Sequence, residues 1–180
     1  TETKSYPIVK IGTQYWIGRS LEATRYTDGS SINEIKDYQM NLPGYFTYNN
    51  KYFYTYPAIE TGYLSTIGWK IPNQKEWDSL KDYLKNRASN LKSGSWKLIE
   101  KGDNYDALNK SYFNGIPEGY FINYEKTKGY AMKDAGVGYW VSQNKSDPET
   151  KGGVYLLNTN DEIREGTTAD RAISVRCIRK

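Results

Sequence analysis

Residues Gly68–Leu84, with the sequence GWKIPNQKEWDSLKDYL, contain the clearest secondary-structure signal in this chain. Asn73 is a favourable N-cap residue for a helix, and Glu76, three positions later, can complete a capping box. Three large apolar side chains then follow at positions that share one helix face: Trp77, Leu80 and Leu84. The pattern predicts a helix over Pro72–Ser89 with this apolar face buried.

Strand patterns occupy both ends of the chain. Residues Tyr6–Ile17 carry apolar side chains on each side of Gly12, which predicts a strand, a tight turn and a second strand. Near the other end, apolar and polar residues alternate over Ile173–Ile178. This period of two predicts a strand with one buried face, with Cys177 pointing inward and Arg176 on the opposite face.

The rest of the chain is predicted to consist of short strands and loops. Residues 24–52 are polar and contain three turn-forming pairs: Asp28-Gly29, Pro43-Gly44 and Asn49-Asn50. We expect loops there, with a short helical turn through Ile32, Ile35 and Tyr38. Four strand-like runs follow the helix: Trp96–Ile99, Tyr120–Tyr124, Tyr139–Ser142 and Val154–Asn158. We predict a single α+β domain over residues 1–180.

The composition favours a folded protein whose core is built from aromatic residues. With 18 Tyr, 5 Trp and an aromatic fraction of 15%, large rings can supply the buried area that aliphatic residues provide elsewhere. The net charge of +4 is too small to indicate a polyanionic partner, so nucleic-acid binding is not expected. No apolar run approaches the roughly 18 residues of a membrane-spanning helix. A chain that starts at Thr1 without an apolar leader is expected to be a mature chain or an excised domain.

Several catalytic chemistries are excluded by residue types that are missing. The chain has no histidine, which removes imidazole bases and zinc sites with histidine ligands. Ser-x-x-Lys pairs occur at the frequency expected by chance and lack the companion motifs of the enzymes that use them. The single cysteine, Cys177, is predicted to be buried and inert. We therefore predict that the protein is not an enzyme.

Seven segments resemble, in the same order, the segments of a known domain family. They are Ile11–Trp16, Ala23–Gly29, Gly68–Leu80, Leu91–Trp96, Phe113–Tyr120, Gly138–Ser142 and Ser174–Arg179. For example, FNGIPEGY at Phe113–Tyr120 is similar to the family's F-x-A-L-P-G-G-Y, and SVRCIR at Ser174–Arg179 is similar to its closing S-V-R-C-V-R. The chain thus resembles the Fibrobacter succinogenes major paralogous domain, which is common in surface proteins of gut Bacteroidetes.

This resemblance implies a C-type-lectin-like fold. Such a fold has terminal strands that lie close together, two helices, and a second small sheet beneath long loops. The resemblance also implies export to the bacterial cell surface, at the outer membrane, where these domains are often carried by lipoproteins or fimbria-like subunits. It implies no known reaction.

Four of the departures from the family pattern bear on possible function. Ser65 stands where relatives often have cysteine, so Cys177 has no partner within the chain for a cross-link. Lys70 replaces the usual histidine, Ser20 the usual asparagine, and Val141 a tryptophan. Any function that relatives share through these positions is expected to be altered here.

Calcium-dependent sugar binding is not expected. The Glu-Pro-Asn or Gln-Pro-Asp and Trp-Asn-Asp motifs of true C-type lectins, whose oxygen atoms converge on the ion, are missing. The oxygen-rich stretches Asp147–Glu149 and Asn160–Glu162 are the candidates for calcium, but acidic loop residues are usually only solvated. We predict no metal and no other cofactor.

Sugar binding without a metal is the sharper hypothesis, because tyrosine rings can stack on a sugar while Asn and Asp side chains bind its hydroxyl groups. Six residues between Gly119 and Gly138 combine these groups: Tyr120, Asn123, Tyr124, Glu125, Tyr130 and Asp134. We expect them on loops between Asn114 and Gly153, which resemble the ligand-bearing region of the fold. Four tryptophans inside the structural motifs are instead expected to pack in the core: Trp16, Trp69, Trp77 and Trp140.

Two classes of function fit these observations. The first is a non-catalytic, surface-displayed binding or adhesion module that recognises a glycan through its loop aromatics. The second is a structural or tip subunit of a fimbria-like surface assembly, whose loops contact another protein. An exposed aromatic groove would favour the glycan, whereas a broad apolar patch or an unpaired strand edge would favour a protein partner.

Overall fold

The computed structural model describes residues 4–97, 107–124, 127–142, 152–167 and 170–180. The strands in these residues are β1 (Ile8–Ile11), β2 (Gln14–Ile17), β3 (Asn33–Glu34), β4 (Gly44–Tyr48), β5 (Lys51–Thr55), β6 (Trp69–Lys70), β7 (Tyr120–Tyr124), β8 (Thr127–Ala131), β9 (Gly136–Trp140), β10 (Gly152–Leu157), β11 (Arg164–Thr167), β12 (Arg171–Ile173) and β13 (Ile178–Arg179). The helices are α1 (Tyr56–Glu60), α2 (Gln74–Tyr83) and the 3-10 turn η1 (Ala88–Asn90).

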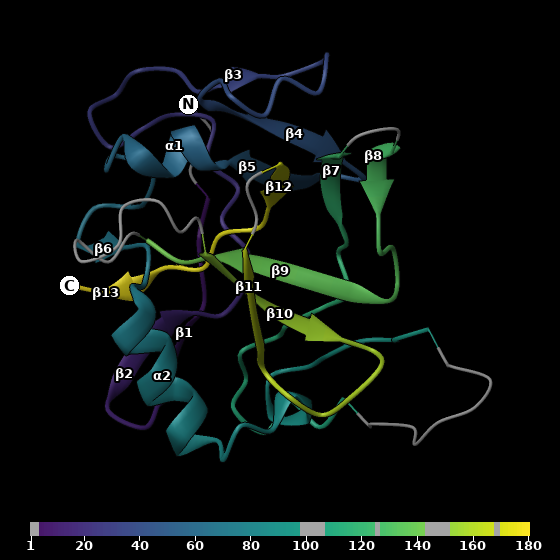
Figure 1. Cartoon of the computed structure of the whole chain (residues 1–180). Helices are drawn as coiled ribbons and strands as arrows, with labels where there is room; N and C mark the ends of the chain where they lie inside the picture. Colours follow the sequence, from purple (N-terminus) through teal and green to yellow (C-terminus); the bar gives the residue numbers. More distant parts are fainter. Residues whose placement is uncertain (1–3, 98–106, 125–126, 143–151, 168–169) are drawn as a thin grey trace.

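The strands form three small sheets, which confirms the predicted α+β class. Their orders are β1-β2-β13-β6, β11-β10-β9 and β3-β4-β5-β12-β7-β8. The named strand pairs are antiparallel except for the parallel pair β3–β4. In Figure 1 the six-stranded sheet and α1 lie at the top, the three-stranded sheet in the middle, and the terminal hairpin with α2 at the lower left. None of the helices in the described residues has the length and apolar character needed to cross a bilayer.

The predicted hairpin near the start of the chain is confirmed. Strands β1 and β2 pair from Ile8↔Ile17 to Ile11↔Gln14, and Gly12 in the turn has a φ of +59°, which a residue without a Cβ adopts without strain. Strand β13 pairs with β2 through Ile178↔Trp16. The last strand therefore joins the sheet of the first hairpin next to β2, so the terminal strands lie close together, as the family resemblance implied.

Helix α2 begins as predicted but ends earlier. The capping box is complete, because Glu76 N donates to Asn73 Oδ1 at 3.0 Å and Asn73 N donates to Glu76 Oε2 at 2.9 Å. The predicted face, made of Trp77, Leu80 and Leu84, is buried. The helix does not reach Ser89, because Lys85 and Asn86 have φ values of 53° and 54° and turn the chain out of the helical conformation.

The centre of the molecule is aromatic, as the composition indicated. The rings of Trp16 and Trp77 lie 4.8 Å apart, and Phe113 packs edge-on to Tyr139 at 5.5 Å. Three of the four tryptophans expected in the core are fully buried there: Trp16, Trp77 and Trp140. Trp69 also packs against the core, but it is only partly buried because it lies on the short edge strand β6.

The expectation of loops over residues 24–52 is wrong for its second half. Strands β4 and β5 form a hairpin there, with the register Tyr48↔Lys51 beside the turn. Asn49 and Asn50 have φ values of 48° and 60°, the pair of left-handed residues that a tight hairpin turn requires. The predicted helical turn through residues 32–38 is absent from the structure, and β3 lies there instead. No strand forms at residues 96 and 97, and the rest of that predicted strand lies outside the described residues.

The closing segment differs most from its prediction. The expected single strand over Ile173–Ile178 is split into β12 and β13, and residues 174–177 between them are buried on every side. This segment crosses from one sheet to another: Ser174 N donates to Gly138 O, and Leu21 N donates to Val175 O. Because residues 174–177 contact protein on both sides, they have no solvent-exposed face. The predicted alternation of buried and exposed residues is therefore wrong.

Two cations are consequently buried. Arg176, expected on the outer face, donates to Ile17 O at 3.0 Å, to Phe113 O at 2.7 Å and to Asn114 O at 2.8 Å. Lys92 Nζ donates to the carbonyls of Leu157 and Asn160, and burial lowers the pKa of Lys92 to about 8. Backbone carbonyls thus act as the partners of both charges.

Candidate functional site

The residues predicted to bind a ligand lie mostly on strands. The strand predicted over Tyr120–Tyr124 is confirmed as β7, and Tyr120, Asn123 and the backbone of Tyr124 lie on it and not on a loop. Tyr130 belongs to β8, so its predicted placement on a loop is wrong. Asp134 does lie in the turn after β8. Glu125 and the side chain of Tyr124 lie outside what the structure describes. Their proposed role in binding stays a prediction.

The side chains of Tyr120 and Asn123 both contact other parts of the protein. Tyr120 is 9% exposed, its ring packs against Tyr155 at 5.9 Å, and the guanidinium of Arg171 covers it at 5.1 Å. Asn123 Nδ2 donates to Tyr38 O at 2.9 Å. The Tyr120 side chain therefore packs against its neighbours, and the Asn123 side chain links β7 to the chain at Tyr38.

Tyr130 and Asp134, in contrast, line a common pocket with a volume of about 320 Å³. The turn between β4 and β5 forms one wall, β8 and its following turn form another, and residues 94–95 and 116–118 close the rest. Its lining residues are Tyr48, Asn49, Lys51, Gly94, Ser95, Ile116, Pro117, Glu118, Tyr130, Lys133 and Asp134. We call it the tyrosine pocket.

A stacked ring pair forms the aromatic wall of the tyrosine pocket. The rings of Tyr48 and Tyr130 lie 4.0 Å apart with an interplanar angle of 25°. Tyr130 packs at its other side on Phe53, at 5.8 Å, and its hydroxyl donates to Glu118 O. Burial raises the pKa of Tyr130 to about 12, which keeps its hydroxyl protonated. Tyr48 is 36% exposed, so it offers the accessible ring.

A buried carboxylate lies in the same pocket. Glu118 Oε2 accepts hydrogen bonds from Ser20 Oγ at 2.7 Å and from Ser174 Oγ at 2.9 Å. Glu118 Oε1 lies 3.7 Å from Lys51 Nζ, beyond hydrogen-bond distance. Two hydroxyl groups thus hold one oxygen in place, while the other oxygen keeps capacity to accept a hydrogen bond.

Sequence reasoning missed Tyr48, Lys51 and Glu118. The signal for Glu118 was present, because it stands at a glycine of the family's P-G-G-Y motif. Its partner Ser20 is also a departure from the family pattern, and the two altered positions meet in one hydrogen bond. Tyr48 had no local signal, since its contact with Tyr130 joins β4 to β8, which three other strands separate in the sheet order.

The charges around the tyrosine pocket are balanced. Lys51 and Lys133 carry positive charge, and Glu118 and Asp134 carry negative charge. Asn49 adds a neutral amide. An aromatic face next to donors and acceptors of both kinds suits an uncharged ligand that carries hydroxyl groups.

The structure offers little to a metal ion. In the part of the chain that is described, no group of three or more acidic or cysteine side chains lies close enough to hold one. Asp161, one of the candidates for calcium, instead binds Arg87 Nε at 3.1 Å and Ser89 Oγ at 3.0 Å. The second candidate, Asp147–Glu149, lies outside the described residues.

Comparison with known proteins identifies the family of the chain. No curated protein and no solved structure matches the chain significantly. The model of the Fibrobacter succinogenes major domain family matches residues 9–179, nearly the whole chain, and the protein therefore belongs to this family.

Proposed function

We propose that this protein is a non-catalytic binding or adhesion module with a C-type-lectin-like fold, exported to the bacterial surface, and that it recognises a neutral glycan in the tyrosine pocket. The observation that carries this proposal is the partly exposed ring of Tyr48 beside the buried carboxylate of Glu118. A sugar needs both features, because its apolar C–H face stacks on a ring while its hydroxyl groups bind at the edge.

The geometry allows both contacts at once. Tyr48 is held against Tyr130, so its ring is already ordered before a ligand arrives and loses little conformational freedom on binding. Glu118 Oε1 is oriented by the two serine hydroxyls on Oε2 and can accept from a sugar hydroxyl. Asn49 and Asp134 lie on the same lining and can bind further hydroxyl groups.

Surface location and the lectin-like fold rest on the family. The pairing of β2 with β13 is consistent with the closing strands of a C-type-lectin-like domain. The non-catalytic role is supported by Cys177, whose thiol is buried and has its pKa raised to about 12 by desolvation. A protonated, inaccessible thiol is a poor nucleophile.

A glycan array with the folded chain, run with calcium and with a chelator, tests the proposal. We expect binding that is insensitive to the chelator and about two- to tenfold weaker in Tyr48→Ala, since a lost stacking contact costs about 0.5–1.5 kcal/mol. Glu118→Gln should also weaken binding. Tyr83→Ala changes an exposed tyrosine outside the pocket and should leave binding unchanged.

Other outcomes would change the assignment. Absence of any hit with a folded sample, or binding that Tyr48→Ala does not affect, would refute the role of the tyrosine pocket. Loss of binding in Tyr124→Ala alone would instead support the candidate that the sequence singled out. Calcium dependence would redirect the search to the acidic stretches.

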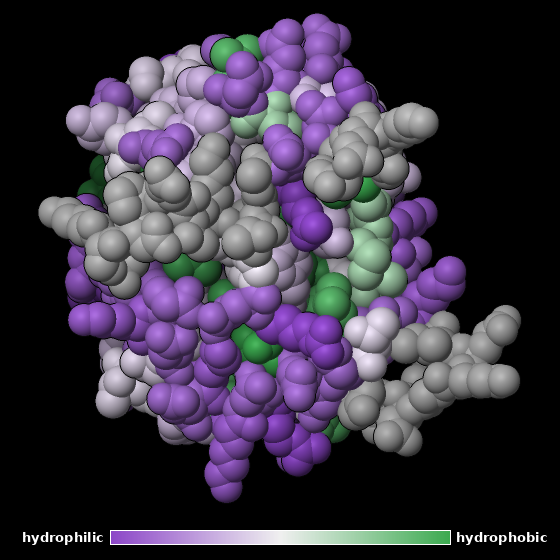
Figure 2. All heavy atoms as spheres, viewed as in Figure 1, coloured by the Kyte–Doolittle hydropathy of each residue, from purple (hydrophilic) through white to green (hydrophobic). Residues whose placement is uncertain are grey.

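The second class of function, a subunit that contacts another protein, is favoured by a different place on the molecule. The face in Figure 2 is largely hydrophilic, and its hydrophobic residues form small separate patches, so it offers no broad apolar surface. Ile67, however, is 89% exposed next to a cleft beside β6.

A further inference from the structure

The ammonium group of Lys51 and the carboxylate of Glu118 face each other across a gap in the tyrosine pocket. Lys51 Nζ and Glu118 Oε1 are 3.7 Å apart, which is too far for a direct hydrogen bond. No described residue accepts a hydrogen bond from Lys51, and none of them donates one to Glu118 Oε1. A donor and an acceptor of opposite charge are therefore left open side by side.

Both groups can be reached from the pocket. The side chain of Lys51 is 36% exposed. Glu118 is buried as a residue, but its Oε1 is not one of the polar side-chain atoms that are fully buried without a hydrogen-bond partner. Since no described residue donates to this oxygen, it keeps some accessible surface, and it belongs to a residue that lines the pocket.

The surrounding structure holds the gap in place. The two serine hydroxyls on Oε2 fix the side chain of Glu118, and the hydroxyl of Tyr130 donates to its backbone carbonyl. Lys51 is the cross-strand partner of Tyr48 beside the turn between β4 and β5. The Cβ atoms of such a pair lie on one face of the sheet, roughly 5 Å apart. The open pair thus starts next to the accessible ring of Tyr48.

Few ligand groups satisfy both sides of this gap. The group must donate a hydrogen bond to Glu118 and accept one from Lys51. A carbonyl or ether oxygen cannot donate, a carboxylate is repelled by Glu118, and an amine is repelled by Lys51. A hydroxyl group carries one donor and two acceptor positions on a single oxygen, so it meets both demands. An oxygen about 2.8 Å from each atom spans the gap of 3.7 Å.

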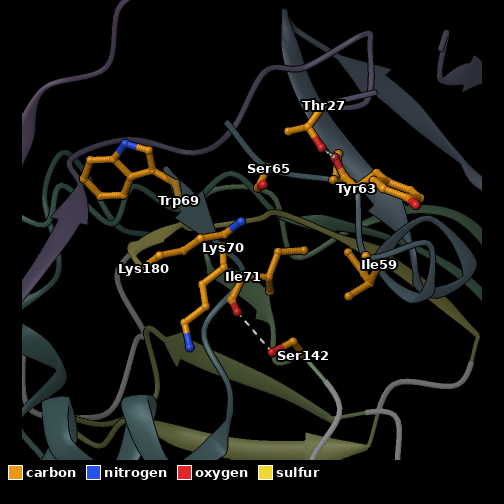
Figure 3. A pocket seen from close by; sticks show the side chains of 11 residues that line it. Thr27, Ile59, Tyr63, Ser65, Trp69, Lys70, Ile71, Ser142 and Lys180 are labelled. Carbon is orange, nitrogen blue, oxygen red and sulfur yellow. Dashed lines mark hydrogen bonds between the residues drawn. The ribbon is translucent and has the colours of Figure 1, made fainter. Parts of the chain in front are cut away.

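The cleft beside β6, shown in Figure 3, has a volume of about 390 Å³ and its polar groups are arranged differently. Its Lys70 lies 2.7 Å from Glu76 Oε1, so this pair is closed by direct contact. Ser142 Oγ donates to Ile71 O at 3.0 Å. The open lysine–carboxylate pair therefore distinguishes the tyrosine pocket from this cleft.

We propose that one hydroxyl group of the bound sugar bridges Lys51 and Glu118, and that this pair makes the tyrosine pocket specific for sugars in which that hydroxyl is free. The hydroxyl donates to Glu118 Oε1 and accepts from Lys51 Nζ. A sugar that is deoxygenated, methylated or glycosidically linked at this position loses one or both bonds. The inference rests on the proposed glycan binding and adds which residues select the ligand.

The test titrates the ¹⁵N-labelled full chain with methyl β-glucopyranoside, methyl β-galactopyranoside and methyl α-mannopyranoside, each up to about 50 mM. The glycoside that binds most tightly is then compared with derivatives in which each ring hydroxyl in turn is removed or methylated. We expect one position at which both changes weaken binding about tenfold, which corresponds to about 1.4 kcal/mol. The amide signals of residues 48–51 and 116–118 should shift on binding.

Three variants assign this effect to the open pair. Lys51→Met removes the ammonium group and keeps the apolar stem, and it should reduce the cost at the sensitive position from about tenfold to about threefold. The ratios at the other positions should stay unchanged. Glu118→Gln should also reduce the cost. Lys128→Met is the matched control, because Lys128 is an exposed lysine on β8 outside the pocket lining, and it should preserve the full cost.

Two results would overturn this inference alone. One is a set of methyl ethers that all bind as tightly as the parent glycoside, and the other is a sensitive position whose cost is the same in Lys51→Met as in the original chain. If Tyr48→Ala still weakens binding in either case, the proposed glycan function stands without this specificity. Absence of binding by all three glycosides would overturn the inference as well, while the glycan array decides the proposed function separately.

Discussion

Replacing Arg176 by methionine removes a guanidinium from the centre of the molecule and keeps much of the side-chain volume. Three backbone carbonyls then lose their donor: those of Ile17, Phe113 and Asn114. The contact between the guanidinium and the Phe113 ring, at 4.3 Å, is lost as well. The substitution therefore acts on the junction between β2, the segment before β7 and the closing segment.

The expected cost follows from these contacts. A buried carbonyl that loses its partner costs about 1–3 kcal/mol, and a part of this is offset because the charge itself no longer has to be buried. We expect the free energy of unfolding to fall by about 3–5 kcal/mol. For a chain of 180 residues this corresponds to a Tm lower by about 6–20 °C.

Urea unfolding followed by tryptophan fluorescence measures this loss, because several tryptophans are buried in the same core. Arg176→Lys should be nearly as harmful, since one ammonium group cannot reach all three carbonyls. Arg179→Met is the control, because Arg179 is exposed and its guanidinium lies over the ring of Tyr15 at 5.8 Å. A loss below about 1 kcal/mol in Arg176→Met would refute the reasoning that the buried carbonyls need this donor.

Two further predictions concern stability. Burial raises the pKa of Cys177 from 9.0 to about 12, so the folded chain keeps a proton that the unfolded chain releases above pH 9. Stability should therefore fall as the pH rises from about 9 to 12, by up to about 1.4 kcal/mol per pH unit, and the urea midpoint of Cys177→Ala should fall less over this window. Asn73→Ala removes the capping box of α2 and should lower stability by about 1–2 kcal/mol, as measured by thermal unfolding. Ser79→Ala, on the exposed side of α2, is its control, and an equal loss in both variants would contradict the capping argument.

The elements that could be predicted from the sequence are those whose signals are local. The start of α2 depends on Asn73 and Glu76, which lie within one turn, and the first hairpin depends on Gly12 and its neighbours. The end of α2 was missed because it depends on the left-handed backbone conformations of Lys85 and Asn86. The identity of these two polar residues does not predict that conformation. The β4–β5 hairpin was missed because a pair such as Asn49-Asn50 is found both in irregular loops and in the tight turn of a hairpin.

The candidate site depends on contacts that no local pattern contains. Tyr48 on β4 contacts Tyr130 on β8 although three strands lie between β4 and β8 in the sheet order, and Ser20 binds Glu118 across 98 positions of sequence. Two of the six predicted residues, Tyr130 and Asp134, nevertheless line the tyrosine pocket. Arg176 was expected on the outer face of a strand, since the alternation of apolar and polar residues does not show that backbone carbonyls in the core accept its hydrogen bonds.

The path of residues 174–177 has a consequence for how the chain acquires its fold. This segment and β13 bind to β2, to β6 and to residues near Leu21, so contacts that complete the core join positions more than 150 residues apart. A topology with such a high contact order folds slowly, because the cost of closing a long loop must be met before the contacts form. A nascent chain therefore cannot complete this core until its last strand has emerged from the ribosome.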